Sequence, residues 1–391
     1  MQRTAVKRQP WTKDAATRRQ TTLVQQRKAR RDLTAHARRL AQHEDSLANH
    51  DRDEGTEPMD DIASVSKRRT REDRVKQRRE YYSKQLMTPE WLLDVPKDLN
   101  GMGSALGEGW YVLPRPEGKR CLVVANGGNT IARIPSGNIL NKFPSALPCG
   151  SYKTNKSSDG YCILDCIYQE QNETFYVLDI MCWKGYLLYN CTSEFRLYWM
   201  RDKLSEGLTA TVSSANPFRF LPIPCYECDQ AGIMAAYSTM YPFHKDGLLF
   251  YMKAGHYEMG LSPLALVWKD SMTSRFFSST KPSIVLRLEQ NNEFLTLEGI
   301  ALFAADQQYI HQFELSEGDL ASFSYDQYED DDKQPPHLTG MTFVKRCSPL
   351  RALPDSWTKI LFQLKTRSGG VTIEQILEVS QLQTTEIEMK A

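Results

Sequence analysis

The sequence predicts an α+β fold in which a basic helical arm precedes a strand-rich domain and a smaller β-rich region follows it. The 391 residues are 41% hydrophobic and 25% charged, which is typical of an ordinary globular protein with about two or three domains. Basic residues gather near the start of the chain: residues 1–94 hold 22 Lys/Arg and 15 Asp/Glu, whereas the remainder is net acidic. From Trp91 onward, short β-branched and aromatic runs alternate with turn residues.

Residues 1–43 are predicted to form the basic arm. They hold 12 Lys/Arg and 2 Asp/Glu, and residues 16–42 contain no Pro or Gly and read as one helix. Leu33, Leu40 and two alanines recur at helical spacing as one narrow apolar stripe. We expect a helix with so little apolar surface to need an acidic partner, either a protein or a nucleic acid, rather than to pack on its own domain. A solvated helix without a partner is the alternative.

A linker and a second helix follow the arm. Residues 44–66 are predicted to be an acidic flexible linker, since residues 44–61 hold 8 Asp/Glu and 1 Lys/Arg. Residues 67–94 are predicted to contain a second basic helix and the entrance to the next domain. The helix is expected to end near residue 86, because the residue before Pro89 disfavours the helical conformation.

Residues 95–280 are predicted to form one α+β domain, and residues 281–391 a smaller β-rich addition of unknown role. The five polar residues between two β-rich runs at 161–168 and 174–183 indicate a hairpin. Helices are expected at 192–204 and 373–381. The other expected strands lie at 110–113, 121–125, 247–252 and 264–268.

Composition excludes several classes of protein. No apolar run reaches the ~18 residues of a membrane helix, and the first residues lack the apolar core of a signal peptide. Nine cysteines are too few for a disulfide scaffold of this length, so we expect reduced thiols in a cytosolic or nuclear protein. Cys225 and Cys228 have zinc-knuckle spacing. Cys162 and Cys166, on one predicted strand, lie too far apart to complete the site, so no metal is expected.

A nucleotide-transfer pattern without its reactive groups runs through the central domain. Four segments resemble, in order and spacing, the motifs of covalent nucleotidyltransferases, namely messenger-RNA capping enzymes and polynucleotide ligases; they are residues 115–120, 178–180, 245–250 and 266–269. Arg115 stands where that family has its nucleophilic lysine, and a guanidinium does not lose its proton near neutral pH. Ile167 replaces an acidic residue of a further motif. The resemblance implies a nucleotide-binding fold that is not an enzyme.

Longer matches resemble one family, the snurportins, which are nuclear import adaptors that bind the trimethylguanosine cap of spliceosomal small nuclear RNAs. The segments are 30–41 (RRDLTAHARRLA), 84–96 (KQLMTPEWLLDVP), 176–183 (YVLDIMCW) and 246–251 (DGLLFY). The resemblance implies two antiparallel sheets around a nucleotide cleft. It also implies an adaptor that shuttles between nucleus and cytoplasm, with no cofactor and no membrane contact.

The resemblance also implies the cap-binding residues. A guanine methylated at N7 is a cationic ring, for which tryptophan is the best stacking partner. Trp268 matches the tryptophan that stacks on the cap base, and Trp91 matches a second one near the base, although packing is an equally good interpretation of Trp91. The tripeptide that matches a cap-contacting segment is Gly118, Lys119 and Arg120.

Two positions depart from the family pattern. Pro89 stands where the family has a cap-contacting serine, and Pro135 stands where it has a lysine. Phosphates need fixed Lys or Arg charges, so Arg133 or Lys142 is expected to replace the missing lysine.

The basic arm matches the importin-β-binding segment of the family. Import receptors present an acidic concave superhelix, which complements a basic helix by long-range attraction. An export receptor binds a short hydrophobic segment at the start of animal members, but residues 1–13 contain no Leu, Ile or Phe, so this contact is not evident. The residues expected to contact importin-β are Arg27, Lys28, Arg30, Arg31, Leu33, Arg38, Arg39 and Leu40.

Two other functions stay open at this point. An active RNA guanylyltransferase or ligase would form a covalent protein–nucleotide adduct. A general RNA-binding protein that uses its basic arm would bind uncapped RNA with a steep salt dependence.

Overall fold

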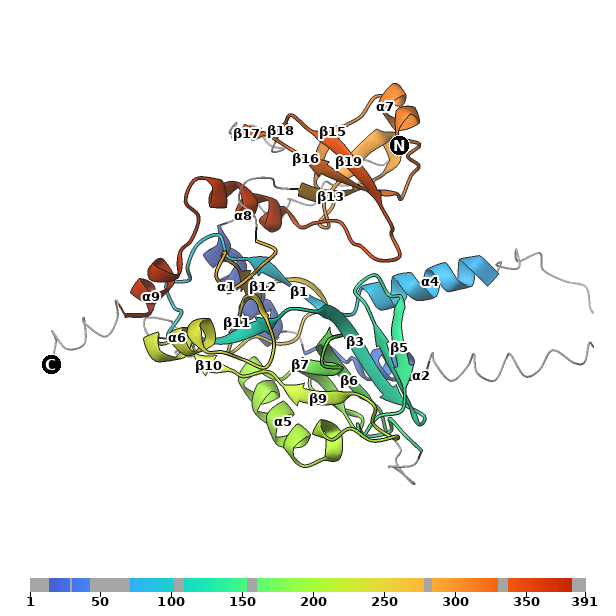
Figure 1. Cartoon of the computed structure of the whole chain (residues 1–391), viewed down its shortest axis with the longest axis vertical. Helices are drawn as coiled ribbons and strands as arrows, with labels where there is room; N and C mark the ends of the chain where they lie inside the picture. Colours follow the sequence, from blue (N-terminus) through green and yellow to red (C-terminus); the bar gives the residue numbers. More distant parts are fainter. Residues whose placement is uncertain are drawn as a thin grey trace, which may run out of the picture.

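The structure is a computed structural model that describes residues 14–28, 30–42, 71–101, 109–152, 160–277, 283–329 and 337–381. Two sheets pack face to face, helices precede them, and a further sheet stands apart from them at the C-terminal side (Figure 1). The expected α+β fold with two largely antiparallel sheets, a basic helical arm and a β-rich C-terminal region is therefore confirmed. The predicted linker at 44–66 and the segment 1–13 lie outside the described residues.

The first sheet contains residues 115–116, 245–250 and 266–268 of the segments that resemble nucleotidyltransferase motifs, whereas residues 119–120 and 178–180 lie in the second sheet. Its strand pairs are antiparallel, except that β1 runs parallel to β12. In spatial order the strands are β1 (Met87–Trp91), β12 (Gly260–Trp268), β11 (Lys245–Met252), β2 (Trp110–Pro116) and β10 (Tyr226–Glu227). Helix α6 (Gln230–Ser238) lies near this sheet, with the side chain of Asp229 capping its first turn.

The second sheet is built around the predicted hairpin. In spatial order its strands are β5 (Ile139–Phe143), β4 (Asn129–Arg133), β3 (Lys119–Asn126), β6 (Cys162–Gln169), β7 (Thr174–Trp183) and β8 (Tyr186–Leu187), and β9 (Arg219–Pro222) pairs with β7 in parallel. Every residue of β6 and β7 is buried. Both faces of these strands are covered, because the first sheet packs on one face and helix α5 (Ser193–Ser205) packs on the other.

A fully buried ion pair ties α5 to the second sheet. Arg196 of α5 donates from Nε and a terminal nitrogen to the two carboxylate oxygens of Asp179 in β7, both at 2.8 Å, and both side chains are 0% exposed. Arg196 also donates to the backbone oxygens of Cys191 and Gly255. Gly255 lies in the connection between β11 and β12, so the guanidinium links the helix to both sheets.

The basic arm differs from the expectation in two ways. It forms two helices, α1 (Ala15–Lys28) and α2 (Thr34–Gln42), rather than one. Asp32 accepts the backbone N–H of Thr34 at 3.0 Å, and such a side-chain acceptor starts a new helix where a continuous one would need the backbone carbonyl.

The second difference is that the arm packs on its own domain. Ala37, Leu40 and Ala41 of α2 are 0% exposed and belong to the core between the sheets. Tyr82 of helix α4 (Arg71–Ser83) donates its hydroxyl to the backbone oxygen of Leu40 at 3.0 Å, and Asn126 donates to Ala41. The apolar stripe was correctly identified, but it is wide enough to dock because its alanines allow the helix backbone to approach strand β3 closely.

The C-terminal region has a core of its own and then returns to the main body. Its five-stranded sheet contains β15 (Ala301–Ala304), β14 (Glu293–Leu295), β13 (Ser283–Leu288), β16 (Leu320–Ser324) and β19 (Thr342–Cys347). The remaining elements are the short pair β17 (Gln327–Glu329) and β18 (His337–Thr339), and helix α7 (Gln307–Gln312). Helices α8 (Trp357–Arg367) and α9 (Ile373–Gln381) then pack on the outer face of the first sheet, where Phe362 and Ile376 are buried.

All nine cysteines are free thiols in the structure. Within the described ranges, no helix has both the length and the apolar character that crossing a membrane requires.

Replacing Arg196 with methionine is expected to lower the free energy of unfolding by about 3–5 kcal/mol, because it leaves the buried Asp179 carboxylate without a partner. Urea denaturation followed by tryptophan fluorescence measures the loss. Lys203→Met on the same helix is the matched control: its ion pairs with Asp202 and Glu206 are at the surface, so it should change stability by less than about 1 kcal/mol. Equal losses in the two variants would contradict the structural role of the buried pair.

Candidate nucleotide-binding site

A charged cluster lies where three neighbouring strands of the first sheet meet. Asp246 of β11 accepts hydrogen bonds from Lys269 Nζ at 2.6 Å and from Ser274 Oγ at 2.6 Å, and it pairs with Arg115 of β2. The three charges converge because β11 pairs with β2 on one side and with β12, which Lys269 follows, on the other. The cluster carries two positive charges and one negative charge.

Glycine at position 247 makes this convergence possible. Gly247 has a φ of +99°, and a Cβ there would lie 2.4 Å from the backbone oxygen of Trp268. The register between β11 and β2 shifts between Lys245 and Leu248. A side chain at residue 247 would therefore push β11 away from β12 and separate Asp246 from Lys269.

The electrostatics of the cluster favour a bound anion. Burial alone would raise the pKa of the Asp246 carboxyl, but Arg115 and Lys269 outweigh burial and the pKa is lowered. Burial lowers the pKa of Lys269 to about 8, with Arg115 acting in the same direction and Asp246 opposing it. At pH 7 Lys269 is therefore still protonated, and together with Arg115 it can attract a phosphate. Arg115 cannot serve as a covalent nucleophile, because its guanidinium keeps its proton.

Trp91 lies beside the cluster. Its ring centroid is 5.8 Å from Lys269 Nζ, and its strand β1 pairs Trp91 with Val267 of β12. The ring is half-buried, because Phe362 of α8 lies against it with a centroid distance of 4.8 Å. Trp91 also donates its backbone N–H to Thr358 Oγ1 at 3.2 Å. The site is thus partly covered by the C-terminal helix.

Trp268 is in the core. It is 0% exposed, and its Nε1 donates to the backbone oxygen of Val371 at 2.8 Å. Successive residues of a strand point to opposite faces: Val267 belongs to the core between the sheets, whereas Trp268 belongs to the core beneath α6 and α9. Because a stacking residue needs an accessible face, this burial argues against the base-stacking role that the resemblance implied.

The tripeptide at the β2–β3 turn divides into three different environments. Gly118 has a φ of +156°, and a Cβ there would lie 2.4 Å from the backbone oxygen of Tyr168, so this glycine permits close packing on β6. Lys119 is exposed and pairs with Glu170 at 2.7 Å. Arg120 binds both carboxylate oxygens of the buried Asp165, at 3.0 and 2.6 Å, and donates to the backbone oxygen of Met87. Of the three, Lys119 has the side chain that can reach an outside ligand.

The two positions that depart from the family pattern lie in different sheets. Pro89 is in β1, where the register with β12 shifts between residues 89 and 90. Pro135 is in the β4–β5 turn. Arg133 is buried, with its guanidinium 4.0 Å from the ring centroid of Tyr82, so it serves packing there. Lys142 of β5 is exposed.

A groove that the sequence did not indicate opens next to the cluster. It has a volume of about 730 Å³ and is lined by residues 239–245, residues 271–275 and three residues at the β6–β7 turn. Lys245 and Ser274, which flank or bind Asp246, form part of its wall. Its loops come from three distant parts of the sequence, so no local signal could have predicted it.

No group of three or more potential metal ligands exists in the described part of the chain. Cys228 and both cysteines of the β6 pair are buried, and burial raises the pKa of each of these thiols well above its ordinary value. They behave as small apolar residues of the core.

Residues 85–270 match the family model described as the Snurportin1 m3G cap-binding domain. Among solved structures, the ligase domain of M. tuberculosis LigD shares 11% identity with the chain, covers 68% of it and 96% of itself, and has a TM-score of 0.34. A mycobacterial DNA ligase D complexed with ATP and MES shares 12% identity, covers 69% of this chain and 98% of its own, and has a TM-score of 0.32. Chlorella virus DNA ligase–adenylate shares 11% identity, covers 66% of this chain and 99% of its own, and has a TM-score of 0.29. Structural similarities this weak say nothing about activity.

Lys269 is expected to titrate near pH 8, far below an ordinary lysine. Its pKa is lower in the folded chain than in the unfolded one, so the folded state binds fewer protons between about pH 8 and 10.5 and stability rises with pH in that window. NMR of ¹³C-dimethylated lysines measures the titration. Lys269→Arg should remove the shifted resonance, and Asp246→Asn should lower its pKa further. The description of the cluster is wrong if every lysine resonance titrates above about pH 10.

Proposed function

We propose, from the match of residues 85–270 to the snurportin cap-binding family model, that the chain is a non-enzymatic nuclear import adaptor. It would bind the trimethylguanosine cap of spliceosomal small nuclear RNAs and link the ribonucleoprotein to importin-β, shuttling between cytoplasm and nucleus. The observation that carries the proposal beyond the family match is the half-buried Trp91 next to the Lys269–Asp246–Arg115 cluster. An aromatic face and a patch of positive charge are what a cationic base with an attached triphosphate requires.

The cap would be held in two parts. Its base would stack on Trp91 and take the place of Phe362, a neutral ring that it can replace without losing an ion pair. Its phosphates would lie toward Lys269 and Arg115, and the exposed Lys119 would add charge at the edge. Trimethylation removes the amino donors at N2, so apolar contact with the methyl groups, rather than a carboxylate acceptor, suits this side of the base.

Trp91→Ala is expected to weaken binding of a trimethylguanosine cap dinucleotide by roughly ten- to a hundredfold, because stacking on a base contributes about 1–3 kcal/mol. Trp268→Phe should leave the dissociation constant unchanged and lower the melting temperature, since it removes the hydrogen bond to the Val371 oxygen. Fluorescence titration of the folded variants gives the constants. The opposite result, with Trp268→Phe weakening binding and Trp91→Ala neutral, would restore the stacking role of Trp268.

The arm has an exposed basic face and a buried apolar face, and the basic face supports the importin-β part of the proposal. Six basic residues of the arm are exposed: Arg27, Lys28, Arg30, Arg31, Arg38 and Arg39. The apolar face with Leu40 is buried against the domain, and Leu33 is partly buried. An acidic receptor can therefore meet the basic face of the docked arm, but a superhelix that encloses the whole helix has to lift it off the domain.

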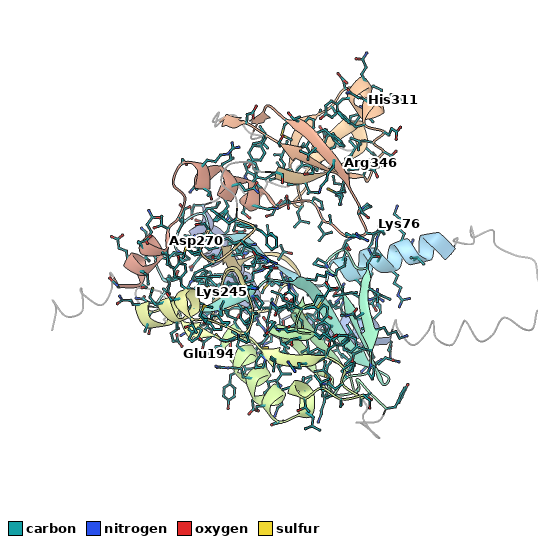
Figure 2. The ribbon with its side chains drawn as sticks, viewed as in Figure 1. Lys76, Glu194, Lys245, Asp270, His311 and Arg346 are labelled. Carbon is teal, nitrogen blue, oxygen red and sulfur yellow. The ribbon has the colours of Figure 1, made fainter. Side chains whose placement is uncertain are left out.

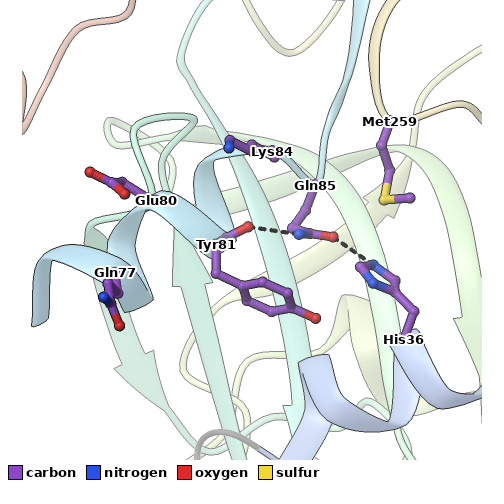
Figure 3. Close-up of a pocket in the computed structure, with 7 residues that line it drawn as sticks. All are labelled: His36, Gln77, Glu80, Tyr81, Lys84, Gln85 and Met259. Atoms are coloured by element: carbon purple, nitrogen blue, oxygen red, sulfur yellow. Dashed lines mark hydrogen bonds between the residues drawn. The ribbon is translucent and has the colours of Figure 1, made fainter. Parts of the chain in front are cut away.

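Polar contacts also hold the arm on the domain. His36 Nε2 lies 2.8 Å from Gln85 Oε1, and Gln85 in turn donates to the backbone oxygen of Tyr81 (Figure 3). Arg18 pairs with Glu90 at 2.6 Å and Arg31 with Glu258 at 3.6 Å. Glu90 is the neighbour of Trp91 in the chain, so lifting the arm removes a contact one residue from the proposed cap site.

Combining Arg38→Glu with Arg39→Glu is expected to abolish importin-β binding and to leave cap binding unchanged, because both residues are exposed. Point substitutions are preferable to deleting residues 1–43, since deletion would expose the core that α2 covers. Calorimetric titration with purified importin-β and with cap dinucleotide separates the two activities. A double variant that still binds importin-β with parental affinity would exclude this face of the arm as the receptor contact.

Two alternatives are distinguishable from the adaptor. For an active guanylyltransferase or ligase, the cluster offers one amine, Lys269, so incubation with labelled GTP or ATP and magnesium would give an adduct that Lys269→Arg abolishes. A general RNA-binding protein would bind uncapped RNA without competition from cap dinucleotide and with a steep salt dependence. Export-receptor binding stays a separate proposal, because residues 1–13 lie outside the described residues.

A further inference from the structure

The groove beside the charged cluster contains polar atoms that the protein does not satisfy. Gln169 lines it, is 4% exposed, and its Oε1 has no hydrogen-bond partner. Asn172 also lines it, and its Oδ1 is buried without a partner. Buried acceptors are almost always paired in native proteins, so two of them in one groove indicate a ligand that donates hydrogen bonds.

The orientation of Asn172 is fixed by its neighbours. Its Nδ2 donates to Tyr176 Oη at 3.0 Å and to the backbone oxygen of Pro242 at 3.4 Å. A carbonyl oxygen can only accept a hydrogen bond, so the end of the amide facing Pro242 is the amino group. The oxygen is therefore the atom left for a ligand.

The charge of the groove selects an anionic ligand. Lys245 and Arg275 line it, and its lining includes no Asp or Glu. Arg275 is 56% exposed, and its partner Glu117 lies outside the lining. Because no carboxylate opposes these groups within the groove, they present positive charge to whatever enters it.

The groove also offers a ring surface. Tyr241 lies on Phe243 with centroids 5.1 Å apart and an angle of 9° between the rings, and Tyr241 lines the groove. Met272, which is 78% exposed, also lines the groove. Flat aromatic groups and thioethers are contacts that a nucleobase accepts regardless of its identity.

We propose that this groove binds an unmodified nucleotide of the single-stranded RNA that follows the cap. The amino and hydroxyl groups of a nucleotide can donate hydrogen bonds to the unpaired oxygens of Gln169 and Asn172. Its phosphate can pair with Arg275 and Lys245, and its base can stack on Tyr241. The trimethylguanine itself fits less well, since methylation removes its amino donors. The inference rests on the proposed function, because the groove adjoins the cluster to which the cap phosphates are assigned through Asp246 and Ser274.

The test compares three ligands on the full chain: a trimethylguanosine cap dinucleotide, a capped oligonucleotide extended by four nucleotides, and the same oligonucleotide without a cap. The extension should raise affinity roughly tenfold, in line with stacking and phosphate contacts. Gln169→Met and Arg275→Gln should each remove most of this gain and leave affinity for the dinucleotide unchanged. Arg275→Gln should also reduce the salt slope of oligonucleotide binding by about 0.7, the value for one single-strand phosphate.

Arg346→Gln is the matched control. Arg346 is 49% exposed and pairs with one carboxylate, Asp319, as Arg275 pairs with Glu117, and it lies on the C-terminal sheet, away from Lys245 (Figure 2). It should not change binding of any ligand. A 4-thiouridine at each extension position in turn should crosslink to residues 239–245 or 271–275.

The outcomes separate the two proposals. If the dinucleotide binds but the extension adds nothing, or if Arg346→Gln weakens binding as much as Arg275→Gln, the groove assignment is overturned and the cap proposal stands. If capped and uncapped oligonucleotides bind equally and Arg275→Gln weakens both, the groove assignment stands and the cap proposal fails. Crosslinks confined to other segments also overturn the groove assignment.

Discussion

Two buried carboxylates face each other across the central hairpin, and the rest of the fold depends on how they are neutralised. Asp165 of β6 and Asp179 of β7 are paired residues of the ladder, and both are 0% exposed. Like charges directly opposite each other destabilise a sheet, so each needs its own buried guanidinium. Arg196 neutralises Asp179, while Arg120, with the hydroxyl of Tyr257, neutralises Asp165.

These pairs also position the proposed cap site. Arg120 reaches from the second sheet to the backbone oxygen of Met87, the first residue of the strand that ends in Trp91. Tyr257 donates its hydroxyl to Asp165 and accepts the backbone N–H of Met87 at 2.9 Å. Strand β1 is thus anchored to the opposite sheet at one end, which fixes the place of its tryptophan at the other. Arg120, which the family resemblance predicted to contact the cap, therefore holds the two sheets together instead.

The sequence was sufficient to predict helices and strands. It was insufficient to predict which face of a strand a side chain occupies and which residue it contacts. Runs such as residues 174–183 predicted strands because burial on both sides requires continuous apolar residues. The role of Trp268 depended on which face of β12 it occupies, and a shift of one residue reverses that face. The break in the arm depended on Asp32 finding the amide of Thr34, and the groove on loops that meet only in the folded chain. The motif match predicted that Arg120 contacts the cap, because a sequence match does not reveal that Asp165 on the neighbouring strand binds its guanidinium.

The hydrogen bond from Trp268 to Val371 spans 103 residues of sequence, which has a consequence for the order in which the protein folds. A ribosome adds about 5–20 residues per second, so the outer face of the first sheet waits roughly 5–20 seconds for the helix that covers it. During that interval the indole N–H and the apolar side chains around it are open to water and to other chains. Nascent chains of this protein therefore have an apolar surface that closes only late in synthesis.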